Sequence, residues 1–298
     1  MALVTQRIRS RARRRALLAL VLAGVLGPTL ARAQSFEHHA PYTGEWAGSA
    51  AFREIRATVE RERVAALGTI SRSLGLELRG DKRVEGIVFE YVDEGAAATL
   101  GFPATSRGGF RPPLDSNARE RGIVVIVDRF LENRDELPGF VCHEMIHAAM
   151  SLLMGAKFVS LAPWVQEGLA VYGAGQGPDK LARLVAAEGA APKDFPDGLD
   201  RQQDRLADYV EAYLAVAYLA EVRGSASVRA FVAEIVKGTP PAQAIETASR
   251  ATWAQFAKGA ADYARERLAA IAPRKASTEL VIPPAEPEPT LAPVAPAP

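Results

Sequence analysis

The chain has 298 residues, of which 24% are charged and 48% hydrophobic, with four histidines and one cysteine. Residues 1–33 carry seven arginines and no acidic residue, so the formal net charge of +1 becomes 36 − 7 = 29 basic against 35 acidic residues, or −6, without them. That balance lacks the basic footprint of a nucleic-acid-binding protein. A single cysteine also excludes an internal disulfide.

The first 33 residues have the three parts of an export signal. Six arginines lie between residues 7 and 15, an apolar run follows at 16–26, and Ala31-Arg32-Ala33 offers a small-residue cleavage site before Gln34. We therefore expect a bacterial periplasmic or secreted protein without a stable membrane anchor after cleavage. An uncleaved anchor is the alternative, although the apolar run is short for a span of about 20 residues. The paired arginines also resemble a twin-arginine signal.

Residues 34–272 are expected to form the folded domain. Apolar residues recur at helical spacing over about 51–74 and predict an amphipathic helix. Runs rich in β-branched residues at 84–92 and 122–128 predict two strands. The Gly/Pro/Arg-rich connection between them, at 94–121, is long enough to be functional or mobile.

The central motif is HEMIH at residues 143–147, an H-E-x-x-H sequence. Because each helical residue advances by about 100°, His143 and His147 lie one turn apart on one face, with Glu144 beside them. Catalytic zinc takes three protein ligands and a water, with bonds to histidine nitrogen of about 2.0–2.1 Å. The motif therefore predicts two zinc ligands and a general base for the water. A helix that has this sequence by chance is the alternative.

A candidate third ligand follows in the segment PWVQEGLA at residues 163–170. It places Glu167 at the start of a second predicted helix, so that His143, His147 and Glu167 would form a His₂Glu site. An ordinary surface carboxylate is the alternative. Cys142 precedes the motif but points about 100° away from His143, so we expect it to pack as a small buried hydrophobe.

The segments HEMIHA and PWVQEGLAVY resemble the gluzincin zinc metallopeptidases, and more narrowly the bacterial peptidase MA-like group. The resemblance is strong over about residues 136–175 and weaker to about residue 270. It implies an α+β fold like a minimal thermolysin, with a small mixed sheet before the motif helix and a mostly helical half after it. It also implies that an edge strand of the sheet holds an extended peptide by main-chain pairing.

One position departs from the thermolysin pattern. Four residues after the third ligand, that pattern has an aspartate that supports a zinc-binding histidine, whereas this chain has Val171. Carboxylates of this kind fix the tautomer and orientation of the histidine. Another group must therefore support the histidine, or the site is looser.

Two tyrosines further along the chain are candidate catalytic residues. Tyr209 and Tyr213 lie one turn apart in a long predicted helix at about 201–223 and can face the same cleft. The run at 209–219 resembles the downstream tyrosine helix of the MA-like group. A phenol there could donate a hydrogen bond to the oxyanion that develops during acyl transfer. Core packing of both rings is the alternative.

The remaining segments complete the predicted organisation. Residues 179–200 mix a helix-like piece with glycines and prolines and are expected to form a lid or a connection. Helices are predicted at 228–237, 240–249 and 253–271. From residue 273 to 298 the composition changes to Pro, Ala, Glu and Thr, which predicts a disordered tail.

The sequence thus predicts an exported metallopeptidase that uses Zn²⁺ to hydrolyse a peptide or protein substrate. Glu144 takes the proton of the attacking water and delivers it to the leaving amine. A non-catalytic zinc-binding scaffold or chaperone is one alternative, but metal binding alone does not need Glu144. A zinc hydrolase of a non-peptide amide is the other. No motif indicates an oligomeric state.

Overall fold

The structure is a computed structural model, and it describes residues 42–112, 122–188, 199 and 205–271. The expected signal peptide at 1–33 and the expected tail at 273–298 lie outside these residues. Within them the fold is α+β and mostly helical, with one small sheet, as predicted.

The first half of the chain surrounds the sheet with helices. Its long helices are α2 (Ala50–Leu74) and α6 (Leu137–Met154). The strands are β1 (Val88–Val92), β2 (Gly108–Arg111) and β3 (Gly122–Ile126). Short helices connect them: α3 (Lys82–Glu85), α4 (Glu94–Thr99), α5 (Val127–Leu131) and η2 (Arg134–Glu136).

The second half is entirely helical in the described residues. After η3 (Gly155–Ser160) come α7 (Pro163–Gly173), α8 (Gly177–Glu188) and α9 (Leu206–Arg223). The chain then forms α10 (Ser225–Lys237), α11 (Pro241–Ser249) and α12 (Trp253–Ile271). The three last helices were predicted at nearly these bounds.

The strands form a mixed sheet with the order β1-β3-β2, in which β1 and β3 are parallel and β2 is antiparallel to β3. Alternate side chains serve two faces, as the period of a strand requires. Phe89, Tyr91, Ile123 and Val125 belong to the main core, whereas Val124 packs with Val92, Ile126 and Ala97 of α4 in a smaller cluster.

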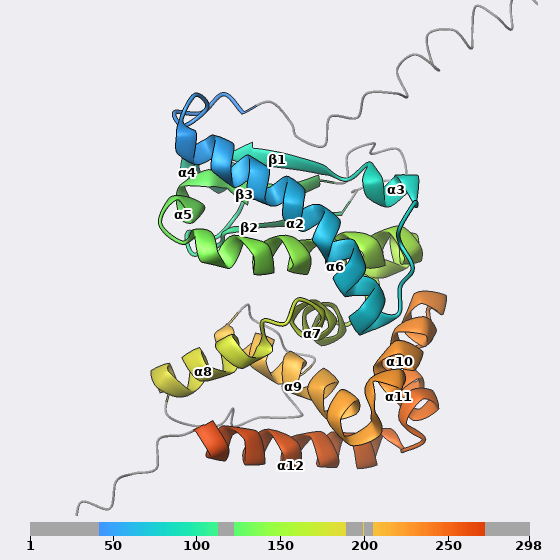
Figure 1. Ribbon diagram of the computed structural model, residues 1–298. Helices are drawn as coiled ribbons and strands as arrows, with labels where there is room; N and C mark the ends of the chain where they lie inside the picture. The colour runs from blue at the N-terminus through green and yellow to red at the C-terminus, as the bar shows by residue number, and fades with distance from the viewer. Residues whose placement is uncertain (1–41, 113–121, 189–198, 200–204, 272–298) are drawn as a thin grey trace, which may run out of the picture.

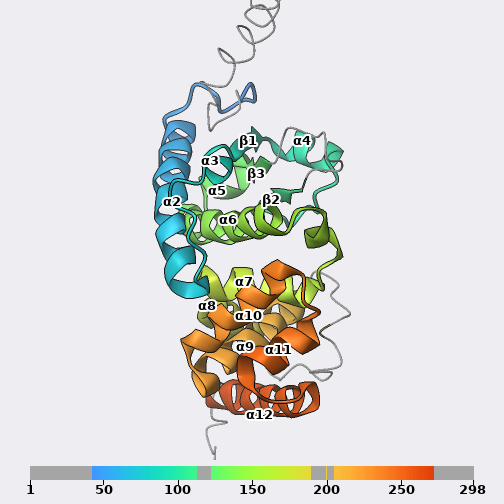
Figure 2. The same cartoon turned by 90° about the vertical axis from the view of Figure 1, so that its right-hand side faces the viewer.

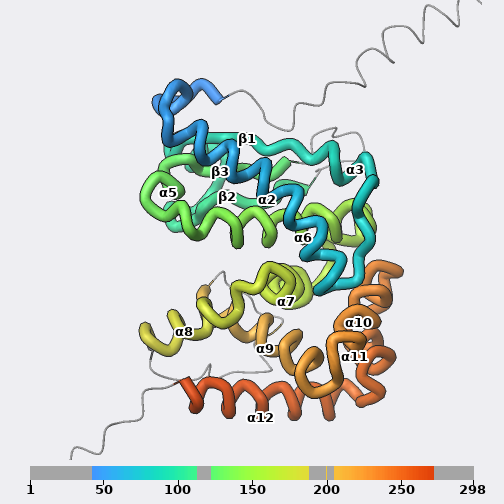
Figure 3. The backbone as a smooth tube through the Cα atoms, in the orientation of Figure 1, coloured from blue at the N-terminus to red at the C-terminus, as the bar shows by residue number. Residues whose placement is uncertain are grey.

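The elements form two layers that meet at α7. Figure 1 shows α2, the sheet and α6 in one layer, α8 to α12 in the other, and α7 between α6 and α9. Turned by 90°, the molecule keeps this order, with α12 farthest from the sheet (Figure 2). The tube in Figure 3 shows that the end of α2 reaches toward α10, and the two helices are in contact. α2 therefore contacts both layers.

The connection at 94–121 contains α4 and the strand β2, which its glycine-rich sequence does not reveal. Two predictions about the neighbouring strands need correction. Val84 lies in α3 instead of a strand, because Asp81 caps a helical turn there. Val127 begins α5 although its sequence continues the β-branched run of β3.

The motif helix is apolar enough to resemble a membrane span. The stretch Arg134–Ser160 has a mean hydropathy of 1.2 in its most apolar window, yet 83% of that window is buried inside the protein. α6 is therefore the central core helix, between α2 and the sheet on one side and α7 on the other.

Candidate metal centre

α6 brings its polar motif into the core of the protein. Pro138 lies in the first turn, where a missing N–H costs nothing. Most of the helix is buried, including His143, Glu144 and His147, whose residues are 6%, 8% and 8% exposed. Buried polar groups of this kind need partners, since an unpaired one is costly.

α7 supplies the third candidate ligand, and a glycine sets how closely this helix lies against α9. A Cβ atom on Gly168 would come within 2.5 Å of the carbonyl oxygen of Ala212 on α9. Only glycine therefore permits this approach of the two backbones. Because Glu167 directly precedes Gly168, the close packing of α7 on α9 also fixes where the backbone of Glu167 lies.

The three predicted ligands converge on one point. Nε2 of His143 and Nε2 of His147 are 3.0 Å apart, and the carboxylate oxygens of Glu167 lie 3.2 Å from the first and 3.4 Å from the second. Ligand atoms of a tetrahedral zinc site with bonds of about 2.0–2.1 Å lie about 3.3 Å apart. The spacing of these side chains therefore fits a metal ion held among them.

The charges at this point also call for a cation. Oε2 of Glu167 is buried and has no hydrogen-bond partner among the described residues. Burial alone would raise the pKa of Glu167, but the two imidazoles hold it well below its usual range. Burial would lower the pKa of His147, and Glu167 instead raises it to about 8. The buried carboxylate therefore needs a positive charge beside it, which a metal ion would supply.

Gln176 takes the place of the aspartate that the sequence lacks. Its side-chain oxygen Oε1 lies 3.0 Å from Nδ1 of His143 and accepts the hydrogen bond from that nitrogen. With the proton on Nδ1, Nε2 keeps a free lone pair that points toward Glu167 and His147. Val171, at the expected position, is buried in the core instead. Gln176 thus leaves Nε2 as the nitrogen of His143 that could bind a metal ion.

Glu144 is held apart from the ligands by the edge of the sheet. Its Oε2 accepts a hydrogen bond of 2.7 Å from the backbone N–H of Phe110 on β2. In the register with β3, the backbone N–H and C=O groups of Gly108 and Phe110 point away from β3, toward the edge of the sheet. At Gly108 both of these groups bond to the Ser106 hydroxyl, at 3.2 Å and 2.8 Å. The edge of β2 therefore borders the candidate metal centre.

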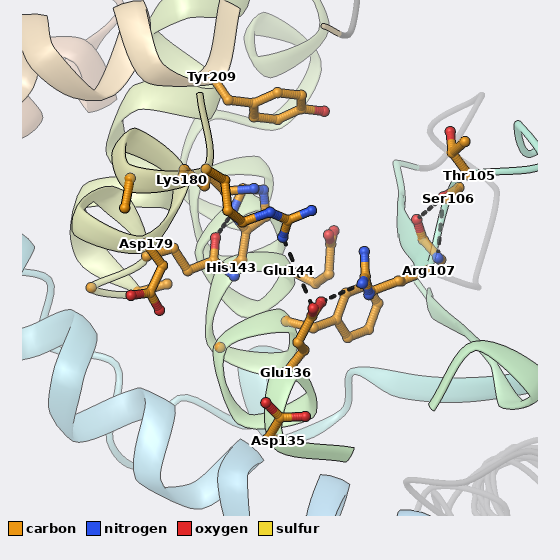
Figure 4. Close-up of a pocket in the computed structure, with 18 of the residues that line it drawn as sticks. Thr105, Ser106, Arg107, Asp135, Glu136, His143, Glu144, Asp179, Lys180 and Tyr209 are labelled. Carbon is orange, nitrogen blue, oxygen red and sulfur yellow. Dashed lines mark hydrogen bonds and ion pairs between the residues drawn. The ribbon is translucent and has the colours of Figure 1, made fainter. Parts of the chain in front are cut away.

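A cavity of about 830 Å³ opens beside the centre. It is lined by His143 and Glu144 and by parts of β2, α8 and α9. Figure 4 shows Tyr209 and Lys180 on one side of Glu144, and Arg107 on the other. The cavity is large enough for several residues of a peptide, since ligand pockets of about 300–1,000 Å³ are typical.

The structure separates the two predicted tyrosines. Tyr209 lines the cavity. Tyr213 packs on α8 instead: a Cβ atom on Gly177 would lie 2.1 Å from its ring, and the ring joins the cluster of Leu181 and Leu214. Of the pair, Tyr209 is therefore the one that shares the cavity with His143 and Glu144.

Cys142 stays apart from the candidate ligands, as expected. It belongs to the main core, and burial raises the pKa of its thiol to about 11. The described group that could hold a metal ion consists of His143, His147 and Glu167, and its ligand atoms lie within 4.8 Å of one another.

Several residues of the site escaped the sequence analysis. Gln176 lies in a turn nine positions after Glu167, where no helical spacing connects the two. Phe110 contributes a backbone N–H, which every residue except proline has. Only the resemblance, which implied that a strand edge lies near the metal, pointed in the direction of β2.

Comparisons with known proteins give no relative to support an assignment. No protein-family model matches this chain, and neither a curated protein nor a solved structure matches it.

Proposed function

We propose that the protein is a zinc-dependent metallopeptidase of the gluzincin type, exported from a bacterial cell, that hydrolyses peptide bonds. One observation carries the proposal. Three side chains converge with the spacing of zinc ligands, while Glu144, on the same helix, faces the adjoining cavity without joining them. A purely structural metal site has no need for that fourth group.

The donor set favours zinc. Two imidazole nitrogens and one carboxylate oxygen are the protein ligands of a common class of catalytic zinc sites, which keep one position open. A bound zinc ion would lower the pKa of a water molecule and polarise the carbonyl group of the substrate. His143, His147 and Glu167 would hold the ion, and Gln176 would orient His143 by its hydrogen bond.

Glu144 is the proposed general base. It would take a proton from the attacking water and pass it to the amine that leaves. The Phe110 N–H donates to Oε2, which holds the carboxylate beside the cavity and leaves Oε1 for the water. Tyr209 borders the same cavity and would donate a hydrogen bond from its phenol to the developing oxyanion.

The edge of β2 supports a peptide as the substrate. An extended peptide can add to a strand edge by main-chain hydrogen bonds. In the described residues, the outward N–H and C=O of Gly108 bond to the Ser106 hydroxyl, which a substrate strand can displace, while the Phe110 N–H keeps its hydrogen bond to Glu144. A small non-peptide amide would make no use of this edge.

Glu144→Gln tests the proposal. Glutamine keeps the size of the side chain and its hydrogen bond to Phe110 but cannot accept a proton, so we expect kcat to fall by about 10²–10⁴. Zinc content and thermal unfolding should match those of the wild type. The assay should offer unfolded protein, a peptide library and simple amides, because these separate a peptidase from an amide hydrolase.

Glu85→Gln, on the exposed surface of α3, is the matched control. It should hydrolyse peptides at the wild-type rate. A Glu144→Gln protein that retains wild-type turnover would refute the proposed mechanism. A wild-type protein that binds zinc but hydrolyses nothing would favour the scaffold.

A further inference from the structure

One face of α8 lines the cavity with positively charged side chains. Lys180 and Arg183 lie three residues apart and project from the same face of the helix, and both line the cavity with His143 and Glu144. Gln176, one turn before Lys180, accepts the hydrogen bond from His143. α8 therefore begins beside the candidate metal centre, and its Lys180 and Arg183 lie along the cavity.

Arg183 shares a carboxylate with the arginine on the opposite side of the cavity. Nη2 of Arg107 lies 2.5 Å from Glu136, and Nη1 of Arg183 lies 3.9 Å from the same carboxylate. Asp135 and Asp179 also line the cavity, but both are exposed, where water and salt screen their charges. Glu136 therefore partly neutralises both arginines.

Lys180 has no such partner among the described residues. Its Nζ lies 4.9 Å from the centre of the Tyr209 ring, and no described carboxylate forms an ion pair with it. Burial lowers the pKa of this ammonium group, Arg183 adds to the effect, and Glu167 opposes it. A half-buried cation of this kind attracts an anion more strongly than an exposed lysine, because water screens it less.

A metal ion at the centre would increase the need for an anion. Glu167 is the carboxylate that most opposes the loss of charge on Lys180. When Glu167 holds a cation with His143 and His147, its negative charge is compensated there. Among the described carboxylates, Glu136 is then the one that still favours the charge on Lys180, and it already pairs with Arg107 and Arg183.

We propose that Lys180 binds a carboxylate of the peptide substrate, one or two residues from the bond that is cut. This inference rests on the proposed peptidase function and names its substrate class. Residues one turn apart on a helix, such as Gln176 and Lys180, are about 5–6 Å apart. An extended peptide covers about 3.3 Å per residue. The carboxylate can belong to an Asp or Glu side chain or to the C-terminus of the peptide.

Kinetic measurements on matched peptides test this specificity. The starting peptide is one that the zinc-loaded wild type cleaves, and its variants carry Asp or Asn at two positions on either side of the bond. A second set has a free or an amidated C-terminus, which distinguishes the two sources of the carboxylate. We expect kcat/KM to favour the acid over the amide by about tenfold or more, as for hydrogen bonds to charged groups.

Substitutions assign the preference to one residue. Lys180→Met should bring the acid-to-amide ratio close to one, and Lys180→Arg should retain most of the preference. Lys82→Met, which removes an exposed lysine on α3, should keep the wild-type ratio. Zinc content and thermal unfolding serve as checks on folding. An equal ratio in the wild type and in Lys180→Met would overturn the inference.

Binding measurements separate this inference from the peptidase function. Fluorescent peptides with the same pairs of Asp and Asn and of free and amidated C-termini, chosen whether or not the wild type cleaves them, are titrated into zinc-loaded Glu144→Gln protein, which should bind without turnover. The acid should bind about tenfold more tightly than the amide, and adding Lys180→Met should remove the difference. If that holds while the wild type cleaves nothing, Lys180 binds peptide carboxylates as inferred and the peptidase function fails. Cleavage or binding that shows no preference dependent on Lys180 overturns this inference but leaves the peptidase function in place. A failure to bind acid peptides also overturns the inference.

Discussion

Two of the helices that line the cavity, α6 and α8, differ in where they keep their polar groups. α6 is buried along nearly its whole length, so His143, Glu144 and His147 lie inside the core. α8 is amphipathic: Leu181, Leu184 and Val185 pack with α9 and α12, whereas Lys180 and Arg183 face the cavity.

The difference indicates that the two helices have different roles. Polar groups in a core are costly unless they are paired, so those of α6 depend on one another and on α7 for their geometry. Polar groups at the edge of a cavity remain in contact with water and can change without disturbing the fold. We therefore expect substitutions on α6 and α7 to abolish chemistry on every substrate. Substitutions on α8 should change which substrates are used.

Tyr209 and Tyr213 provide the sharpest internal test, because they lie one turn apart on α9. Tyr209→Phe should lower kcat by about 10²–10³, the usual cost of removing one oxyanion donor. Tyr213→Phe is the matched control, since its ring packs on Gly177 of α8 and should keep doing so. Both proteins should bind zinc normally. Near-normal turnover by Tyr209→Phe would show that Tyr209 has only a packing role.

Gln176 lies directly before α8 and accepts a hydrogen bond from His143 on α6. Its substitution tests whether this hydrogen bond matters for metal binding. Gln176→Ala removes the acceptor for Nδ1 of His143, and we expect zinc affinity to fall by about 10–100-fold. Gln176→Glu keeps an acceptor and should bind zinc close to the wild-type affinity. Competition with a chelator measures both. Equal affinity in all three proteins would show that His143 does not depend on Gln176.

Gly168 tests the packing that holds Glu167 in place. Gly168→Ala forces a Cβ atom against the backbone of α9, so we expect a loss of about 1–3 kcal/mol in the free energy of unfolding. Gly48→Ala is the control, because a Cβ atom there meets nothing within 4 Å. Urea unfolding gives both values. An unchanged stability for Gly168→Ala would mean that α7 and α9 can separate without cost.

The sequence predicted the part of the site that lies on regular helices. His143, Glu144 and His147 follow from helical spacing alone, and Glu167 from a second apolar segment. The long helix α2 was predictable because its apolar residues recur at helical spacing, and α10 to α12 were predictable from residues that begin and end helices.

The remaining parts depend on tertiary contacts that no local pattern encodes. β2 is four residues long and contains two glycines, so nothing in its sequence distinguishes a strand from a loop. Gln176 meets His143 only because α7 ends and α8 begins beside α6. Tyr209 and Tyr213 looked equivalent on one helix face, and the approach of Gly177 to Tyr213 separates them.

Zinc titration of ligand variants tests the central claim most directly. After removal of metal by a chelator, the wild type should bind one zinc ion per chain, because three donors converge at one point. His143→Ala, His147→Ala and Glu167→Ala should each bind zinc much more weakly, whereas Glu144→Gln should keep the full stoichiometry and affinity. A wild-type protein that binds no zinc, or a Glu167→Ala protein that binds it as tightly as the wild type, would contradict the account.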